Sequence, residues 1–179
     1  MRYSVVSLYL IALFIISACI KESEPTPQTG NEFIVVDHST IKLTSVPSQW
    51  ISEAKKKLHI AYSHTSHGSQ ITDGMSGLVS FKGVSFAWSE DKSSDALHLD
   101  DYAVSGDLGN PDRTTWAGRT RTYLASHPET NVVMWAWCGQ VSTATEKDIN
   151  TYLQLMDGLE KDFPNVTFVY MTGHLDGTG

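Results

Sequence analysis

The sequence predicts an α/β fold in which helices cover both faces of a mainly parallel sheet, as a three-layer sandwich. The main observation is that amphipathic segments alternate with short segments that are largely apolar on both faces. The clearest helical pattern covers 143–162, where apolar residues recur at steps of three and four: Ile149, Leu153, Met156 and Leu159. The segments NVVMWAW at 131–137 and VTFVYM at 166–171 flank that helix, and we expect both to be buried strands.

Start and stop signals place the boundaries of these elements. Thr143 and Glu146 fit a capping box, and Pro164 follows the end of the same helix. Pro128 ends an earlier helical pattern in the same way. The elements that precede the 131–137 strand are identified by helical or strand-like spacing: helices over 47–58, 68–78 and 113–126, and a strand over 58–62.

The N-terminal segment has the pattern of a bacterial lipoprotein. Arg2 precedes an apolar run that is short for a membrane-spanning helix, and Ile16-Ser17-Ala18-Cys19 resembles a lipobox. We therefore expect a signal peptide over 1–18, lipid on Cys19 and anchoring of the exported protein to a membrane of the cell envelope. The Pro- and Gly-containing segment 19–45 is expected to be a flexible tether, and 46–179 to form the folded domain.

Charge and cysteine content exclude some classes of partner and crosslink. The formal net charge is −7, and the one basic run, Lys55-Lys56-Lys57, has the position of a solvated helix face. Nucleic acid is therefore not an expected partner. With Cys19 lipidated, Cys138 is the one remaining cysteine, so no internal disulfide is expected. We interpret Cys138 as a small buried residue rather than a nucleophile.

Polar side chains follow three of the expected strands at the point where each strand ends. In a parallel sheet the carboxyl ends of the strands share one edge, and ligands bind beyond that edge. The sequences after these strands are SHTSHGSQ, CGQ and TGHLDGTG. The edge would therefore gather the following candidate site residues: His64, Ser66, His67, Gln140, His174 and Asp176.

These residues resemble the SGNH (GDSL-like) hydrolases, in particular secreted variants whose first block reads His-x-Ser-x-Gly. The block in this chain is His64-Thr65-Ser66-His67-Gly68, directly after a strand. The resemblance implies a flavodoxin-like, SGNH-type sandwich and Ser66 as the nucleophile. A serine at a strand-to-helix turn exposes its hydroxyl, and N–H groups at the helix start face an oxyanion. Ser69 is the rival nucleophile, and the simpler alternative is that Ser66 only caps the following helix.

The remaining blocks of the family match less completely. The resemblance implies a backbone donor to the oxyanion at Gly106 or Gly109, with Asn110 beside them, although a Gly-Asn-Pro turn explains these residues equally well. Gln140 stands where the family has an asparagine. The family's Asp-x-x-His does not occur after Val169, so we expect a chain truncated at its C-terminus. In a complete chain, His174 and Asp176 would have to replace it.

Two other classes of function remain open. Zinc coordination by His64, His67, His174 and Asp176 is one, but HExxH and paired cysteines are absent from the sequence. The preferred interpretation therefore has no metal and no cofactor. A glycan-binding lipoprotein without catalysis is the other class, with these tryptophans as stacking surfaces: Trp88, Trp116, Trp135 and Trp137. The preferred function is an envelope-anchored serine esterase that acts on a small-molecule or glycan ester.

Overall fold

The computed structural model describes residues 34–92 and 94–173. The chain divides into two units, 1–41 and 42–179. In the first unit, the described residues 34–41 contain a turn in which the Asp37 carboxylate accepts hydrogen bonds from the backbone N–H and hydroxyl of Ser39, at 2.8 and 2.6 Å. The second unit contains all of the described helices and strands.

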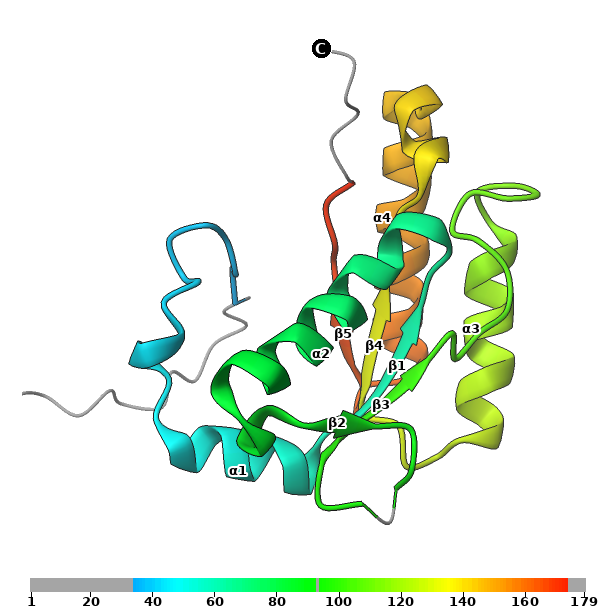
Figure 1. The fold of residues 1–179 in the computed structure, drawn as a ribbon. Coiled ribbons are helices and arrows are strands. Elements are labelled where there is room, and N and C mark those ends of the chain that lie inside the picture. Colours follow the sequence, from blue (N-terminus) through cyan, green and yellow to red (C-terminus); the bar gives the residue numbers. More distant parts are fainter. Residues whose placement is uncertain (1–33, 93, 174–179) are drawn as a thin grey trace, which may run out of the picture. The chain divides into compact units, whose positions relative to one another are not determined.

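The second unit is built on a five-stranded, all-parallel sheet in the order β2-β3-β1-β4-β5 (Figure 1). Its central strand, β1, pairs with β3 on one side and β4 on the other, and Ile60 lies opposite both Leu99 and Val132. This arrangement confirms the predicted α/β class. The strands are β1 (His59–Ser63), β2 (Trp88–Ser89), β3 (Leu97–Asp101), β4 (Val132–Trp135) and β5 (Thr167–Val169).

Helices cover both faces of the sheet, which gives the expected three layers (Figure 1). On one face, α3 and α4 pack against β1, β4 and β5 around Trp116, Trp135 and Met156, each at most 2% exposed. On the other face, α2 packs Ile71 and Met75 against strand residues. The helices are α1 (Ser48–Lys57), α2 (Ser69–Lys82), α3 (Thr115–Ser126) and α4 (Glu146–Asp162), with 3-10 turns η1 (Leu43–Ser45), η2 (Ser66–Gly68), η3 (Val84–Phe86) and η4 (Gly139–Thr143).

Polar groups inside the larger core are paired. Thr120 is fully buried, and its hydroxyl donates to the Trp116 carbonyl at 2.8 Å while accepting the indole N–H of Trp135 at 2.9 Å. The contact therefore pairs two buried groups, the Trp135 indole N–H and the Thr120 hydroxyl itself, and leaving either unpaired would cost about 1–3 kcal/mol. This contact fixes α3 against β4, the strand that leads into the candidate site.

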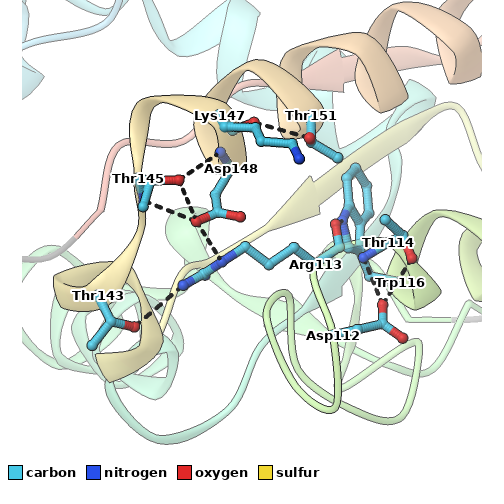
Figure 2. A network of polar contacts seen from close by, with 9 residues as sticks. All are labelled: Asp112, Arg113, Thr114, Trp116, Thr143, Thr145, Lys147, Asp148 and Thr151. Atoms are coloured by element: carbon cyan, nitrogen blue, oxygen red, sulfur yellow. Dashed lines mark hydrogen bonds and ion pairs between the residues drawn. The ribbon is translucent and has the colours of Figure 1, made fainter.

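A polar network holds the segment between β4 and α4 (Figure 2). The Arg113 side chain, 18% exposed, forms an ion pair with Asp148 at 3.3 Å and donates to the Thr143 hydroxyl at 3.2 Å. Thr145 and Asp148 form a reciprocal capping box at the start of α4. The prediction of a box at Thr143 and Glu146 is therefore wrong by two residues, because Thr143 lies in η4 and its hydroxyl accepts a hydrogen bond from Arg113.

The predicted elements are present, most of them shorter than predicted, although α2 extends to Lys82 and β1 ends one residue later, at Ser63. Two strands were not predicted. The segments expected as strands over 131–137 and 166–171 are strand only in their middle residues, β4 and β5. The missed strands, β2 and β3, form one side of the sheet. Within the described part of the chain, no helix has the length and apolar character to cross a membrane.

Candidate functional site

Three segments meet at the carboxyl edge of the sheet because β1, β3 and β4 are adjacent and parallel. Backbone hydrogen bonds extend the pairing just beyond the strands. Ala103 N–H donates to the Tyr62 carbonyl at 3.1 Å, and Ala136 N–H donates to the Ser63 carbonyl at 3.0 Å. The segments after β3 and β4 therefore lie beside the 64–68 segment, which follows β1. The sequence predicted this for the segments after β1 and β4.

Ser66 lies at this edge with an unusual backbone conformation. It is exposed, begins η2 and has φ of 42°, in the left-handed region that non-glycine residues seldom occupy. Such a conformation costs on the order of 1–3 kcal/mol and persists only where its surroundings impose it. The capping interpretation of Ser66 is wrong, since α2 begins at Ser69, its N-cap is Gly68 and no side-chain cap bond is formed.

Gly68 holds the end of the 64–68 segment in place through two hydrogen bonds of its backbone. Its carbonyl accepts the Tyr62 hydroxyl at 2.7 Å, and its N–H donates to the Thr65 carbonyl at 3.0 Å. A Cβ at this position would lie 2.2 Å from the Cβ of His64. The glycine of the His-x-Ser-x-Gly block is therefore required by close packing between the backbone and the imidazole.

His64 supports the site from inside rather than facing solvent. Its ring is fully buried, its Nε2 lies 2.7 Å from the Asp101 carboxylate, and it packs between the rings of Tyr62 and Tyr102 at 4.5 and 4.0 Å. Tyr102 also has a positive φ, 55°, and is half-exposed. The prediction that His64 is a candidate rim residue is thus corrected, because its burial and its pairing with Asp101 make it a positioning residue.

A second contact joins the Ser66 segment to the loop after β3. The Thr65 hydroxyl donates to the buried Asp107 carboxylate at 2.9 Å, and Val104 N–H donates to the Ser63 hydroxyl at 3.1 Å. Asp101 and Asp107 were not identified from the sequence. The only available signal was the alternation in LHLDD, which is typical of a strand ending in carboxylates.

Cys138 and His67 face each other across the edge of the sheet. Cys138 follows β4, and its Sγ lies 4.0 Å from the Nδ1 of His67. Burial raises the pKa of the Cys138 thiol, but hydrogen bonds involving His67, Gly139 N–H and the hydroxyls of Thr65 and Ser66 outweigh burial and lower the pKa to about 7. The expectation that Cys138 is a small buried residue is confirmed, and the structure adds that its Sγ lies near the His67 ring at the edge of the sheet.

The other predicted site residues lie in different places. Gly109 and Asn110 belong to a tight turn, where Asn110 N–H donates to the Asp107 carbonyl at 3.4 Å. Their loop is tied to Thr65 through Asp107. Gln140 lies in η4, two positions after Cys138. His174, Asp176 and the lipidation candidate Cys19 lie outside the described residues.

Ser69, the rival nucleophile, is the first residue of α2 and is half-buried. Its backbone carbonyl accepts the hydroxyl of Thr72 at 3.1 Å, as expected within a helix. The backbone of Ser69 has φ of −59° and ψ of −20°, an ordinary helical conformation, unlike that of Ser66. This difference favours Ser66 as the reactive serine.

A groove of about 630 Å³ lies elsewhere, along α3, where Val104, Ser105, Gly118, Arg119 and Tyr123 contribute to its lining. None of its lining residues belongs to the Ser66 or Cys138 segments, so we do not assign it to the site. Among residues 34–92 and 94–173, no group of three or more histidine, cysteine or acidic side chains is placed to hold a metal ion. The donor set for zinc that included His174 and Asp176 extends beyond those residues.

Comparison of the chain with models of protein families, with characterised proteins and with solved structures finds no match. The site is therefore defined by its own geometry. That geometry is an α/β sandwich with an exposed, strained serine, an adjacent histidine and a cysteine of lowered pKa at the carboxyl edge of its central strands.

Proposed function

We propose that this protein is a serine-dependent ester hydrolase of the SGNH type, with Ser66 as its nucleophile. The observation that carries the proposal is the left-handed backbone of Ser66 at the end of the central parallel strand. Tyr62, His64 and Thr65 hold the segment by buried contacts, and they keep a hydroxyl exposed in a conformation that unconstrained serine would leave.

The proposed reaction is acyl transfer through a covalent intermediate. The Ser66 oxygen attacks the ester carbonyl carbon, the alcohol leaves with a proton, and water then releases the acid and restores the hydroxyl. N–H groups at the start of η2 are suited to stabilise the oxyanion, whereas those of Gly68 and Ser69 already donate to backbone carbonyls. His67 is the candidate base within the described part of the chain, since the His64 ring is buried against Asp101.

The substrate class in this proposal is a small-molecule or glycan ester. Tyr102 supports a cyclic substrate, because its half-exposed ring packs at a tilt against the His64 ring at the same edge as Ser66. Purely aromatic glycan binding is less well supported. Trp116, Trp135 and Trp137 are at most 5% exposed, and their rings pack in the core rather than on a surface.

Lipid anchoring at Cys19 is the localisation that accompanies this function. It is supported by the Ile16-Ser17-Ala18-Cys19 pattern and by the tether-like composition of 19–45. The membrane contact is then made by the lipid, and the folded domain meets its substrate in the cell envelope.

A fluorophosphonate probe tests the nucleophile directly, because an activated serine attacks phosphorus as it attacks an ester carbonyl. We expect the probe to label Ser66 in the full chain. Ser66→Gly should abolish labelling and reduce turnover of a short-chain nitrophenyl ester by about 10³-fold or more. The same variant should be more stable to urea by about 1 kcal/mol, because glycine adopts a positive φ without strain.

Ser69→Ala is the matched control, since it removes a neighbouring hydroxyl without touching the strained position. It should retain both labelling and ester turnover. Labelling that survives Ser66→Gly, or that disappears in Ser69→Ala, would refute the assignment of Ser66.

A further inference from the structure

We propose that a surface formed by Trp50, Phe81, Lys82 and Val84 rests on an anionic lipid bilayer and fixes the orientation of the folded domain. Trp50 lies in α1, Phe81 and Lys82 end α2, and Val84 begins η3. These elements are neighbours, since η3 contacts both α1 and α2 (Figure 1). We call this the α1–η3 surface. It adds a second membrane contact to the one that the proposed lipid on Cys19 would make.

Apolar exposure in the second unit is concentrated at this surface. Trp50, Phe81 and Val84 are 62, 78 and 79% exposed. No other large apolar side chain that the structure describes within 42–179 is more than 54% exposed. Single exposed apolar residues are common on proteins, but a group of them on adjoining elements is typical of a contact surface.

The charges around the α1–η3 surface favour a negatively charged partner. Segments 42–58 and 76–89 together contain five lysines and one acidic residue, Glu53, whereas the formal net charge of the whole chain is −7. The Lys82 Nζ lies 4.7 Å from the centre of the exposed Phe81 ring. Aromatic rings beside lysines are typical of protein segments at the boundary between lipid headgroups and acyl chains. The same surface of a second copy fits less well, because lysines would then face lysines.

The chain enters the domain next to this surface. Residues 19–41 join Cys19 to Lys42, directly before η1 and α1. A flexible tether of that length has an average span of roughly 25–30 Å, so a lipid on Cys19 would keep the start of α1 near the membrane at a high effective concentration. Contacts too weak to hold a free protein at a membrane are sufficient under this condition.

The α1–η3 surface and Ser66 lie at opposite edges of the sheet. α1 and η3 directly precede β1 and β2 at the amino edge, whereas Ser66 follows β1 at the carboxyl edge. α2 runs between the two edges with 14 residues, a length of about 20 Å. Contact through the α1–η3 surface therefore holds Ser66 on the order of 20 Å from the bilayer. For the proposed esterase, on which this consequence rests, such an orientation favours substrates dissolved outside the membrane over membrane lipids.

Photocrosslinking from position 81 tests the proposal. The full chain, with Phe81 replaced by benzoylphenylalanine, is reconstituted into vesicles of phosphatidylethanolamine and phosphatidylglycerol, and mass spectrometry identifies what the probe captures. We expect crosslinks to lipid. The matched control carries the same probe in place of Leu153, which is 44% exposed on α4, across the sheet from α2. It should capture little lipid.

Charge reversal separates a specific contact from mere proximity to the membrane. Lys82→Glu should lower the ratio of docked to undocked domain by roughly 10–30-fold in the anionic vesicles, and the yield of lipid crosslinks from position 81 should fall with it. The same change should have little effect in vesicles of phosphatidylcholine. The control, Lys147→Glu at the exposed start of α4, should leave the yield unchanged.

Two results would overturn the proposal. One is equal capture of lipid from positions 81 and 153. The other is capture of a second copy of the chain from position 81. Neither readout involves ester turnover, so failure of this contact leaves the Ser66 proposal standing, and loss of the Ser66 assignment leaves the membrane contact standing.

Discussion

The segment after β1 and the segment after β4 meet at one edge of the sheet, but they are held in place by different kinds of contact. Residues 64–68 are held by buried groups: His64 pairs with Asp101, and the Tyr62 hydroxyl donates to the Gly68 carbonyl. The η4 segment is held from the side by Arg113 and the capping box of α4 (Figure 2).

This difference shows where the protein concentrates its rigidity. A strained residue such as Ser66 needs surroundings that leave it no alternative, and buried, close-packed contacts provide them. The partly exposed charges around η4 are screened by solvent and contribute less. We therefore expect substitutions at the buried contacts of the 64–68 segment to lower the free energy of unfolding more than substitutions around η4.

Gly68→Ala should have the largest effect. The added methyl would lie 2.2 Å from the His64 Cβ, and both the helix start and the buried ring would have to move. We expect a loss of about 3 kcal/mol in the free energy of unfolding, measured by urea denaturation. Gly74→Ala in α2 is the control, because nothing lies within 4 Å of its Cβ position. It should be neutral or stabilise by up to about 1 kcal/mol. Equal losses in the two variants would contradict the comparison.

Thr145→Ala should have an intermediate effect at η4. It removes the hydroxyl that accepts Asp148 N–H at 3.3 Å and donates to the Asp148 carboxylate at 2.8 Å. The expected loss is about 1 kcal/mol, again from urea curves. Thr151→Ala, in the exposed middle of α4, removes a hydroxyl bonded only to the Lys147 carbonyl, and it should be neutral or slightly stabilising. A loss above that of Gly68→Ala would reverse the proposed order.

Lowering the pH should gradually remove the stability that the Asp148 carboxylate contributes at the start of α4. Hydrogen bonds from the Thr145 N–H and hydroxyl, with the charge of Arg113, hold the pKa of Asp148 below its ordinary value. A carboxyl whose folded pKa is lowered stabilises the protein above its unfolded pKa, near 4, and loses that contribution as the pH falls through the folded pKa. The difference in urea midpoint between the unaltered protein and Asp148→Asn should therefore shrink from pH 5 to pH 2.5. A difference that grows over this range would contradict the assignment.

The fold was largely predictable because its helices and central strands have strong local patterns. The spacing of Ile149, Leu153 and Met156 identified α4, and the apolar character of VVMW identified β4. β3 was missed because His98, Asp100 and Asp101 are polar residues in a strand. Their positions are explained only by tertiary partners, as in the pairing of Asp101 with His64.

The candidate site was predictable in its position but not in its partners. A serine after a strand and before a helix indicated Ser66, whereas the approach of the neighbouring His67 to Cys138 depends on the parallel register of β1 and β4. The capping box of α4 also depends on a partner that is distant in sequence. Both Thr143 with Glu146 and Thr145 with Asp148 have the spacing of a capping box. Arg113, from a loop before α3, donates to the Thr143 hydroxyl and pairs with Asp148, and the second box is the one that forms.

The central position of β1 has a consequence for the order in which the chain is assembled during synthesis. β1 leaves the ribosome before both of its neighbours, and its contact between His59 and Asn131 spans 72 residues. At roughly 5–20 residues per second, that partner is translated on the order of 4–14 s later. Throughout that interval an apolar strand of the future sheet centre has at least one edge unpaired, which is the kind of segment that chaperones bind and that aggregates when left exposed.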